Sequence, residues 1–318
     1  MDPATRMAVV LATDTYETVR PVVRRLAEQT VKERLEVVIV APLPPGSLDA
    51  HRRELDGFAA VQLVSVAPSA GLAAARAIGI RAATAPVVFI GETHTYPQPE
   101  WAAALLDAFE GPWATVVPAI TNANPNGAVS WAAYVSDYGR WGEGRPQGEI
   151  PEALIYNAAY RRQVLLDLGD GLEGALATYS EALWPALHRH GHRAYFEPGA
   201  RIAHLNVGRL GPYVHEKLLA GFILGSLRAA RWPWSRRLLY ILASPLIALV
   251  LAARLREPAC RIGRMHRLPL ATVPLIVAGA GLRAVGEAVA YAGAAPASAD
   301  ARMTEIELHK VAYASRKR

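Results

Sequence analysis

The chain has 318 residues, enough for one catalytic α/β domain and an additional segment. Hydrophobic residues make up 52% of it and charged residues only 19%, so part of the chain is predicted to contact something other than water. The formal net charge is +6, with arginines crowded into residues 228–267 beside apolar runs. This pattern favours anionic lipid over nucleic acid as a partner, because stacking aromatics are few and no nucleic-acid-binding motif is present.

Cys260 is the only cysteine, which excludes a disulfide within the chain and a cysteine metal site. This usage is typical of a reducing compartment. Residues 1–14 lack a basic region followed by an apolar stretch of signal-peptide length, so we expect no export by the usual route.

The first part of the chain alternates between apolar runs and amphipathic segments. Unbroken apolar runs predict strands at residues 7–13, 35–41, 61–66, 87–90 and 114–118. Helical spacing and composition predict helices at residues 18–33, 71–83 and 101–110. Strands that are apolar throughout and separated by helices indicate an α/β fold with a parallel sheet covered on both faces.

Beyond residue 150 the pattern is less regular. We expect a strand and a helix within residues 154–168, a helix at 179–190 and a strand at 194–206. From residue 213 onward apolar segments alternate with basic ones, and this change predicts a domain boundary near residue 210. The predicted domains are therefore residues 1–210 and 211–318.

Ligands of a parallel sheet bind beyond the carboxyl ends of its strands, so the residues that follow each strand are the candidates for a site. After the strand at 87–90, an extended backbone would point Glu92 and His94 to the same side. One carboxylate and one imidazole can hold a divalent cation that bridges two phosphates, and this ligand pair suits Mn²⁺ better than Mg²⁺. Taken alone, two such residues are more often polar loop residues.

Residues 9–41, 71–100 and 156–204 together resemble the family 2 glycosyltransferases. The resemblance rests on a strand–helix–strand opening, an Ala-rich helix before the strand at 87–90, and later segments at 157–169 and 191–206. It also includes an acidic motif that is followed by Pro97, Pro99, Glu100 and Trp101. The resemblance implies a GT-A (Rossmann-like) domain that binds a nucleotide sugar with a divalent cation.

The sequence departs from the family pattern at several positions. Glu92-Thr93-His94 stands where the family has Asp-x-Asp, and Ala41 stands where an Asp contacts the nucleobase, so UDP and GDP both stay open. Arg76-Ala77 replaces an Arg-Asn pair. The resemblance implies that Arg76, Glu92 and Thr93 contact the donor, together with Thr13, Asp14, Glu17 and Ala41.

The family's catalytic base corresponds to Glu181 here, with Glu173 as the second choice. Such a carboxylate accepts the proton of the acceptor hydroxyl in an inverting transfer. His204 resembles the late histidine that completes the metal site in some members. Without the resemblance, Glu181 is a helix-start acid, His204 a structural histidine and Asp14 a helix cap. No chemistry is assigned to His188, His190 or His192.

The C-terminal part predicts attachment to a membrane. Trp and Arg mix at residues 228–237, as in a lipid head-group layer, and apolar runs follow at 238–253 and 268–282. Both runs are shorter than a bilayer span and carry basic flanks, including a basic tail at residues 315–318. We expect re-entrant or interfacial helices on the cytoplasmic face of the cell membrane; core helices or a homo-oligomer interface are the alternatives.

The sequence therefore predicts a cation-dependent inverting glycosyltransferase acting on a lipid or lipid-linked acceptor. A catalytically degenerate GT-A-like module that binds membranes or partners is the second hypothesis, because acidic family residues are missing. A nucleotidyltransferase is the third, and the lack of a Gly-rich phosphate loop near the first strand argues against it.

Overall fold

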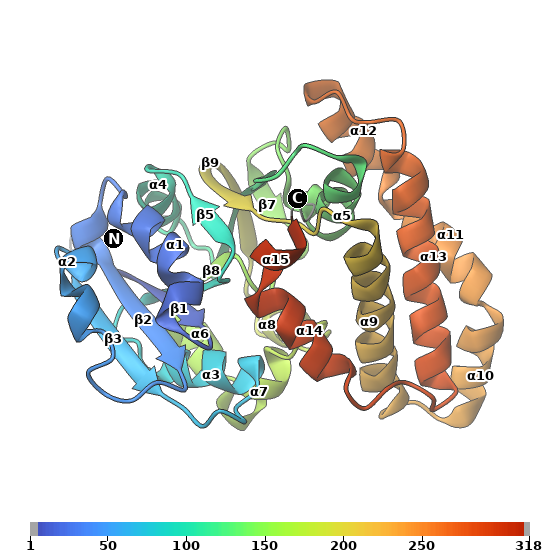
Figure 1. The fold of residues 1–318 in the computed structure, drawn as a ribbon, viewed down its shortest axis with the longest axis horizontal. Helices are drawn as coiled ribbons and strands as arrows, with labels where there is room; N and C mark the ends of the chain where they lie inside the picture. Colours follow the sequence, from blue (N-terminus) through green and yellow to red (C-terminus); the bar gives the residue numbers. More distant parts are fainter. Residues whose placement is uncertain (1–5, 315–318) are drawn as a thin grey trace. The chain divides into compact units, whose positions relative to one another are not determined.

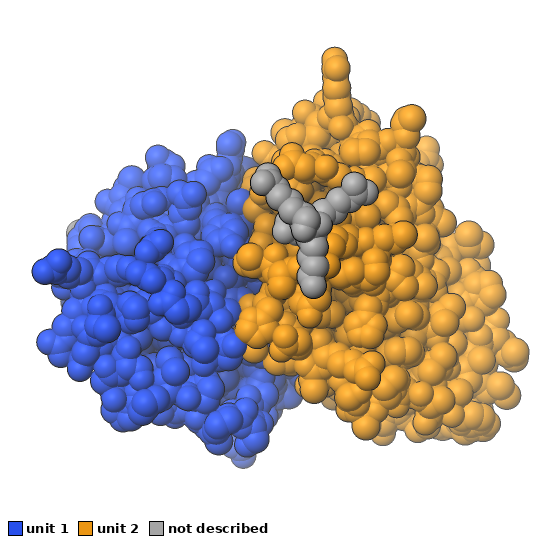
Figure 2. Space-filling model, in the orientation of Figure 1, with its two compact units in different colours: residues 1–120, 146–177, 181–203 blue, residues 121–145, 178–180, 204–318 orange. Residues whose placement is uncertain are grey.

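The computed structural model describes residues 6–314, and these fall into two compact units (Figure 2). Unit 1 contains residues 6–120, 146–177 and 181–203, and unit 2 contains residues 121–145, 178–180 and 204–314. The predicted basic tail at residues 315–318 lies outside the described residues. Each unit has its own architecture: unit 1 is built on a sheet, and unit 2 is helical (Figure 1).

The sheet has the strand order β3-β2-β1-β4-β8-β6-β9-β5, with β7 paired to β9. The strands are β1 (Met7–Ala12), β2 (Leu35–Ala41), β3 (Ala60–Ser65), β4 (Val87–Gly91), β5 (Thr95–Pro97), β6 (Thr115–Asn122), β7 (Gly148–Ile150), β8 (Ala158–Arg161) and β9 (Ala194–His204). The first four strands in this order are parallel to one another. The α/β class predicted from the sequence is confirmed.

The prediction of a parallel sheet is wrong beyond β4. Strand β8 pairs antiparallel with both β4 and β6, so β6, the strand predicted at 114–118, runs in the same direction as β4 but is separated from it by a reversed strand. An apolar run indicates burial on both faces but carries no signal of strand direction, which depends on how the connecting segments return. The sheet is therefore mixed.

Strands β1, β2 and β4 are buried at every residue, as expected for strands covered on both faces. Helix α3 packs directly on β1 and β2, because a Cβ on Gly79 would lie only 2.5 Å from Val10 and 2.7 Å from Val40. The helices of this unit are α1 (Tyr16–Ala27), α2 (Arg52–Leu55), α3 (Leu72–Ala82), α4 (Trp101–Ala108), α6 (Arg162–Leu166), α7 (Leu172–Ala175) and α8 (Leu183–Arg189).

The helix predicted at residues 179–190 is shorter, because α8 begins only at Leu183. Tyr179 has φ 60°, a left-handed conformation that a bulky side chain rarely adopts and that no α-helix contains. The residues between Tyr179 and α8 therefore form an irregular segment, and Glu181 lies in it.

Unit 2 is a set of helices whose two long members approach closely. A Cβ on Gly221 of α9 would lie 2.2 Å from the carbonyl oxygen of Arg283 on α13, and one on Gly286 would lie 2.5 Å from that of Leu218. The glycines thus let the two backbones touch. The helices of this unit are α5 (Ala128–Tyr138), α9 (Leu210–Ala229), α10 (Trp234–Leu242), α11 (Ser244–Arg254), α12 (Arg256–Met265), α13 (Thr272–Tyr291), α14 (Ala299–Leu308) and α15 (Lys310–Ala314).

The predicted length of the second apolar segment is wrong. It forms part of α13, a helix of 20 residues that is long and apolar enough to cross a membrane by length and composition, although 39% of its apolar window is buried inside the protein. The first segment is broken instead: α10 and the helical stretch at residues 244–265 are bent by 67° from each other. The apolar run read from residue 268 ended too early because Arg283 and Glu287, which pair with each other inside unit 2, interrupt it.

Candidate functional site

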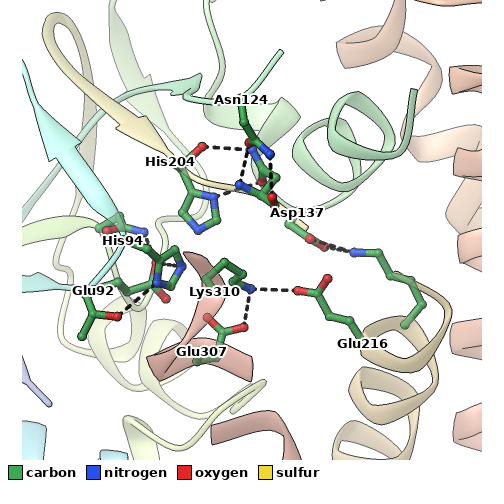
Figure 3. Close-up of polar contacts among 12 residues, drawn as sticks. Glu92, His94, Asn124, Asp137, His204, Glu216, Glu307 and Lys310 are labelled. Carbon is green, nitrogen blue, oxygen red and sulfur yellow. Dashed lines mark hydrogen bonds and ion pairs between the residues drawn. The ribbon is translucent and has the colours of Figure 1, made fainter. Parts of the chain in front are cut away.

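Three buried side chains form a group that could hold a metal ion. Glu92 follows β4, His94 precedes β5 and His204 ends β9 (Figure 3). One ligand atom from each lies within 4.8 Å of the others, and none of the three residues is more than 6% exposed. The structure thus brings together the three residues that the sequence analysis named as metal ligands.

The backbone between Glu92 and His94 is a turn and not the extended chain considered in the sequence analysis. Strand β4 ends at Gly91, and Thr93 and His94 form a turn rather than a continued strand. The expectation of an extended backbone through Glu92 and His94 is therefore wrong. The turn still brings His94 Nε2 to 3.8 Å from Glu92 Oε2, so the two side chains converge without the alternation of a strand.

Hydrogen bonds orient both imidazoles. His204 Nδ1 lies 3.0 Å from Asn206 Oδ1, and the amide nitrogen of Asn206 donates to Asn122 Oδ1 and to the His204 carbonyl oxygen. Since Asn206 Oδ1 can only accept, His204 Nδ1 carries the proton and Nε2 carries the lone pair that a metal ligand needs. His94 Nδ1 lies 3.3 Å from Thr93 Oγ1, which leaves Nε2 as the atom directed toward Glu92.

These residues fit a divalent cation. A carboxylate oxygen and two imidazole nitrogens are a donor set that first-row transition ions accept, whereas Mg²⁺ prefers oxygen alone. The short separations and the fixed Nδ1 hydrogen bond of His204 match the arrangement in which outer partners orient metal ligands. Thr93 contributes the hydrogen bond to His94 and is itself buried.

Arg76, predicted to contact the donor, is buried with part of its guanidinium unpaired. Its Nε and Nη1 atoms have no hydrogen-bond partner among the described residues, and the residue is 4% exposed. The guanidinium carbon lies 3.7 Å from the centroid of the Tyr156 ring. Buried unpaired donors are rare in native proteins and are explained where a ligand supplies the acceptor. Arg76 therefore offers donors to an anionic or carbonyl-bearing ligand.

The predicted donor residues at the end of β1 have local roles in the structure. Thr13 is buried, and Asp14 Oδ1 accepts a hydrogen bond of 2.8 Å from the Thr15 amide. The cap of α1 is Thr15, whose hydroxyl accepts from the Thr18 amide, so the alternative of Asp14 as the cap is wrong. Glu17 points outward and pairs with Arg20 at 3.1 Å.

The remaining predicted residues are placed as follows. Ala41 ends β2 and is buried. Glu181 and Glu173 are both exposed, the first in the irregular segment before α8 and the second in α7. Tyr179, two residues before Glu181, has a left-handed backbone conformation, which is strained for a bulky side chain. Such outliers cluster at functional sites, and no sequence signal points to them.

The sequence analysis missed three residues that surround the candidate ligands. Tyr156 stacks on Arg76, Asn157 Nδ2 lies 2.5 Å from Glu92 Oε2, and Asn206 orients His204. Tyr156 and Asn157 precede a strand that the sequence did predict, and Asn206 lies two residues beyond His204. The polar character of the residues at these strand ends was the available signal.

Comparison with known proteins gives a family and a fold. The mannosyltransferase PcManGT from Pyrobaculum calidifontis, in complex with GDP-Man and Mn²⁺, is similar with a TM-score of 0.50 and 18% identity, over 96% of this chain and 87% of that one. GalNAc-T7 with UDP, GalNAc and Mn²⁺ gives a TM-score of 0.50 and 17% identity over 63% of this chain, which spans only 43% of the GalNAc-T7 chain. A search of curated proteins found no match.

At these identities the likeness to solved structures concerns the fold, which is that of the GT-A glycosyltransferases. The family model described as Glycosyl transferase family 2 matches residues 8–169, just over half of the chain, and that span contains Arg76, Glu92 and His94. The chain belongs to glycosyl transferase family 2.

Proposed function

We propose that this protein is a cation-dependent, inverting glycosyltransferase. It moves a sugar from a UDP- or GDP-sugar to a lipid or lipid-linked acceptor at the cytoplasmic face of the cell membrane. The observation that carries the proposal is the buried group of Glu92, His94 and His204. Solved structures with the same fold support it, since GalNAc-T7 binds UDP together with Mn²⁺ and PcManGT binds GDP-Man together with Mn²⁺.

On the donor side, Glu92, His94 and His204 hold the cation, for which Mn²⁺ fits better than Mg²⁺. A bound cation neutralises the negative charge that builds on the leaving diphosphate. Arg76 adds a positive charge whose unpaired donors suit the nucleotide, with Tyr156 fixing the plane of its guanidinium. Thr13, Asp14, Glu17, Ala41 and Thr93 complete the proposed donor contacts.

On the acceptor side, Glu181 is the proposed base. It accepts the proton of the acceptor hydroxyl as that oxygen attacks the anomeric carbon. Its exposure and its place in an irregular segment beside a strained tyrosine support this role, because an acceptor needs access from solvent or lipid. Glu173 is the second candidate.

The membrane part of the proposal rests on the surface of unit 2. Leu239, Leu242, Leu246 and Leu249 of α10 and α11 are each 62–72% exposed. Exposed arginines lie in the same part of the chain, at positions 231, 236, 254, 256, 264 and 267. Trp234 is 57% exposed beside them, and aromatic and basic side chains together suit a lipid head-group layer. An acceptor that is itself a lipid would follow from this location.

The decisive experiment is calorimetric titration of the detergent-solubilised full chain with UDP and with GDP, with and without Mn²⁺. We expect binding of one nucleotide that depends on Mn²⁺ and that weakens at least about tenfold in Glu92→Ala and His94→Ala, as removal of metal-site groups does. His190→Ala is the control, since His190 is exposed at the end of α8. Binding of neither nucleotide would instead favour the catalytically degenerate module.

The base assignment has its own test. Glu181→Gln should lower kcat about 10²–10⁴-fold with nucleotide binding unchanged, measured as release of nucleoside diphosphate in the presence of membrane lipid. Glu173→Gln is the matched variant, since Glu173 is also exposed. Loss of activity in Glu173→Gln with activity retained in Glu181→Gln would move the role to Glu173.

A further inference from the structure

Asn157 is a buried residue that no part of the proposed function uses. It lies directly before β8, is 0% exposed, and its amide donates to the Ile90 carbonyl oxygen at 2.7 Å. Strand pairing therefore anchors its backbone opposite the end of β4, two residues before Glu92. Its φ of 55° is left-handed, a conformation that asparagine and glycine adopt more readily than other residues.

The side chain of Asn157 is directed at a candidate metal ligand. Its Nδ2 atom donates a hydrogen bond of 2.5 Å to Glu92 Oε2, the same oxygen that lies 3.8 Å from His94 Nε2. The other amide atom, Oδ1, is buried and has no hydrogen-bond partner among the described residues. The carboxylate can only accept, which fixes Nδ2 as the atom facing it.

A purely structural turn residue would leave a different pattern. Asparagines in left-handed turns commonly bond neighbouring backbone groups with their side chains. Asn157 Nδ2 instead donates a hydrogen bond to the carboxylate of Glu92, 65 positions away in the sequence, and its Oδ1 is buried without a hydrogen-bond partner among the described residues. A buried polar atom without a partner destabilises the folded state, so the unpaired Oδ1 points to a ligand that satisfies it.

We propose that Asn157 is a positioning residue of the cation site, a role that rests on the proposed binding of a cation by Glu92, His94 and His204. Its Nδ2 holds the Glu92 carboxylate in the orientation that faces His94. Its Oδ1 supplies a further buried oxygen for the ligand. The left-handed backbone is what aims this short side chain at Glu92.

Two substitutions separate this role from a structural one. Asn157→Gly keeps the left-handed backbone and removes both amide atoms, so the affinity for Mn²⁺ should fall about 10- to 100-fold. Asn157→Asp keeps the shape but places a second carboxylate beside Glu92. That variant should unfold at a lower temperature without Mn²⁺ and should show a larger rise of Tm on adding Mn²⁺ than the unsubstituted chain.

The control is Gln29→Ala, in a buried amide of the same unit whose hydrogen bonds go to the backbone of Arg25, Gln98 and Ala102. It should lower Tm equally with and without Mn²⁺ and leave the affinity for Mn²⁺ unchanged. The measurements are Mn²⁺ titration by calorimetry and thermal unfolding of the full chain in detergent, so neither depends on activity.

The outcomes distinguish this inference from the proposed function. Mn²⁺ binding that is lost in His94→Ala but unchanged in Asn157→Gly would overturn the positioning role alone. Equal Tm changes in both Asn157 variants, with and without Mn²⁺, would also overturn it and make Asn157 structural. Absence of any Mn²⁺ binding that depends on His94 would remove the cation site itself and this inference with it.

Discussion

Arg76 is a buried charged side chain with unpaired hydrogen-bond donors among the described residues. Burying a charged group at 4% exposure destabilises the folded state unless the charge is paired. The Arg76 guanidinium stacks on the ring of Tyr156, but its Nε and Nη1 atoms have no hydrogen-bond partner among the described residues. These unpaired donors support the proposed contact between Arg76 and the nucleotide. Arg81, another basic residue of the same helix, is exposed and donates a hydrogen bond to the Gly169 carbonyl oxygen, so nothing about it indicates a contact with a ligand.

Replacing Arg76 by methionine should therefore weaken nucleotide binding. Arg76→Met keeps an unbranched chain against Tyr156 and removes the donors, and loss of charge-assisted hydrogen bonds worth about 1.5–3 kcal/mol corresponds to a fall in affinity of roughly 10- to 150-fold. Titration with the preferred nucleotide in the presence of Mn²⁺ measures this. Arg81→Met is the matched control and should bind as the unsubstituted chain does; equal affinities in both variants would contradict the assignment.

The sequence leads to Glu92, His94 and His204 as proposed metal ligands, because the family resemblance places acidic and histidine ligands at strand ends. It misses Asn157 and Asn206, since their roles depend on contacts made only after the sheet forms. Asn157 meets Glu92 across 65 positions through the pairing of β4 with β8, which was not predicted as antiparallel. The left-handed φ of Asn157 also leaves no mark on composition or periodicity.

Among the elements, the sequence predicts the buried strands of unit 1 well. β1, β2 and β4 are short apolar runs, and their burial follows from hydrophobicity alone. Strand direction and the start of α8 are predicted poorly. Both depend on backbone geometry, the first on the return of the chain and the second on the φ of Tyr179.

The close contact between α9 and α13 leads us to predict opposite changes in stability when two glycines of unit 2 are replaced by alanine. A Cβ on Gly221 would lie 2.2 Å from the Arg283 carbonyl oxygen, which is backbone and cannot move aside, whereas one on Gly281 would meet nothing within 4 Å. Gly221→Ala should therefore lower the free energy of unfolding by about 1–3 kcal/mol through overpacking. Gly281→Ala should raise it by up to about 1 kcal/mol through helix propensity. Unfolding in detergent by chemical denaturant measures both, and a gain in stability for Gly221→Ala would show that the helices do not touch there.

A buried ion pair joins α15 to α9. Lys310 Nζ of α15 lies 3.0 Å from Glu216 Oε1 of α9 and 2.7 Å from Glu307 Oε1 (Figure 3). Burial alone would raise the pKa of Glu216, but Lys310 and Lys217 outweigh it and hold this pKa below its usual value. A carboxyl with a lowered pKa stabilises the folded state at neutral pH, and this contribution is lost as the pH falls through its folded pKa.

Removing Lys310 takes away the cation that contributes most to lowering the pKa of the buried Glu216 carboxyl. We expect Lys310→Met to lower the free energy of unfolding at pH 7 by about 3–5 kcal/mol, as loss of one partner of a buried pair does. The loss should shrink as the pH falls toward 4, because Glu216 then takes up a proton and no longer needs a counterion. Denaturant unfolding at several pH values measures this trend. Lys310→Met combined with Glu216→Gln should recover part of the stability, and a loss that is independent of pH would contradict the account.

At the scale of the whole molecule, both the composition of the chain and the surface of unit 2 support the proposed contact with a membrane. The chain is 52% hydrophobic, and most of the large apolar side chains that are exposed among the described residues belong to α10, α11 and α13. Leu270, Val273 and Val277, at 97%, 56% and 51% exposure, continue the apolar surface at the start of α13. Large exposed apolar patches mark membranes or partners, and exposed arginines beside them favour an anionic bilayer.

Flotation with lipid vesicles tests this directly. The full chain, transferred out of detergent, should float with phosphatidylglycerol vesicles more strongly than with phosphatidylcholine vesicles, and added salt should narrow the difference, since it screens the arginines. Leu242→Glu combined with Leu246→Glu should reduce flotation with both, because burying a charge in lipid opposes the apolar contact. Ile78→Glu, at an exposed apolar residue of α3 in unit 1, is the control and should float as the unsubstituted chain does. A chain that stays soluble and monodisperse without lipid would remove the membrane from the proposal, and one that forms a defined oligomer and ignores vesicles would assign the same leucines to an interface between copies.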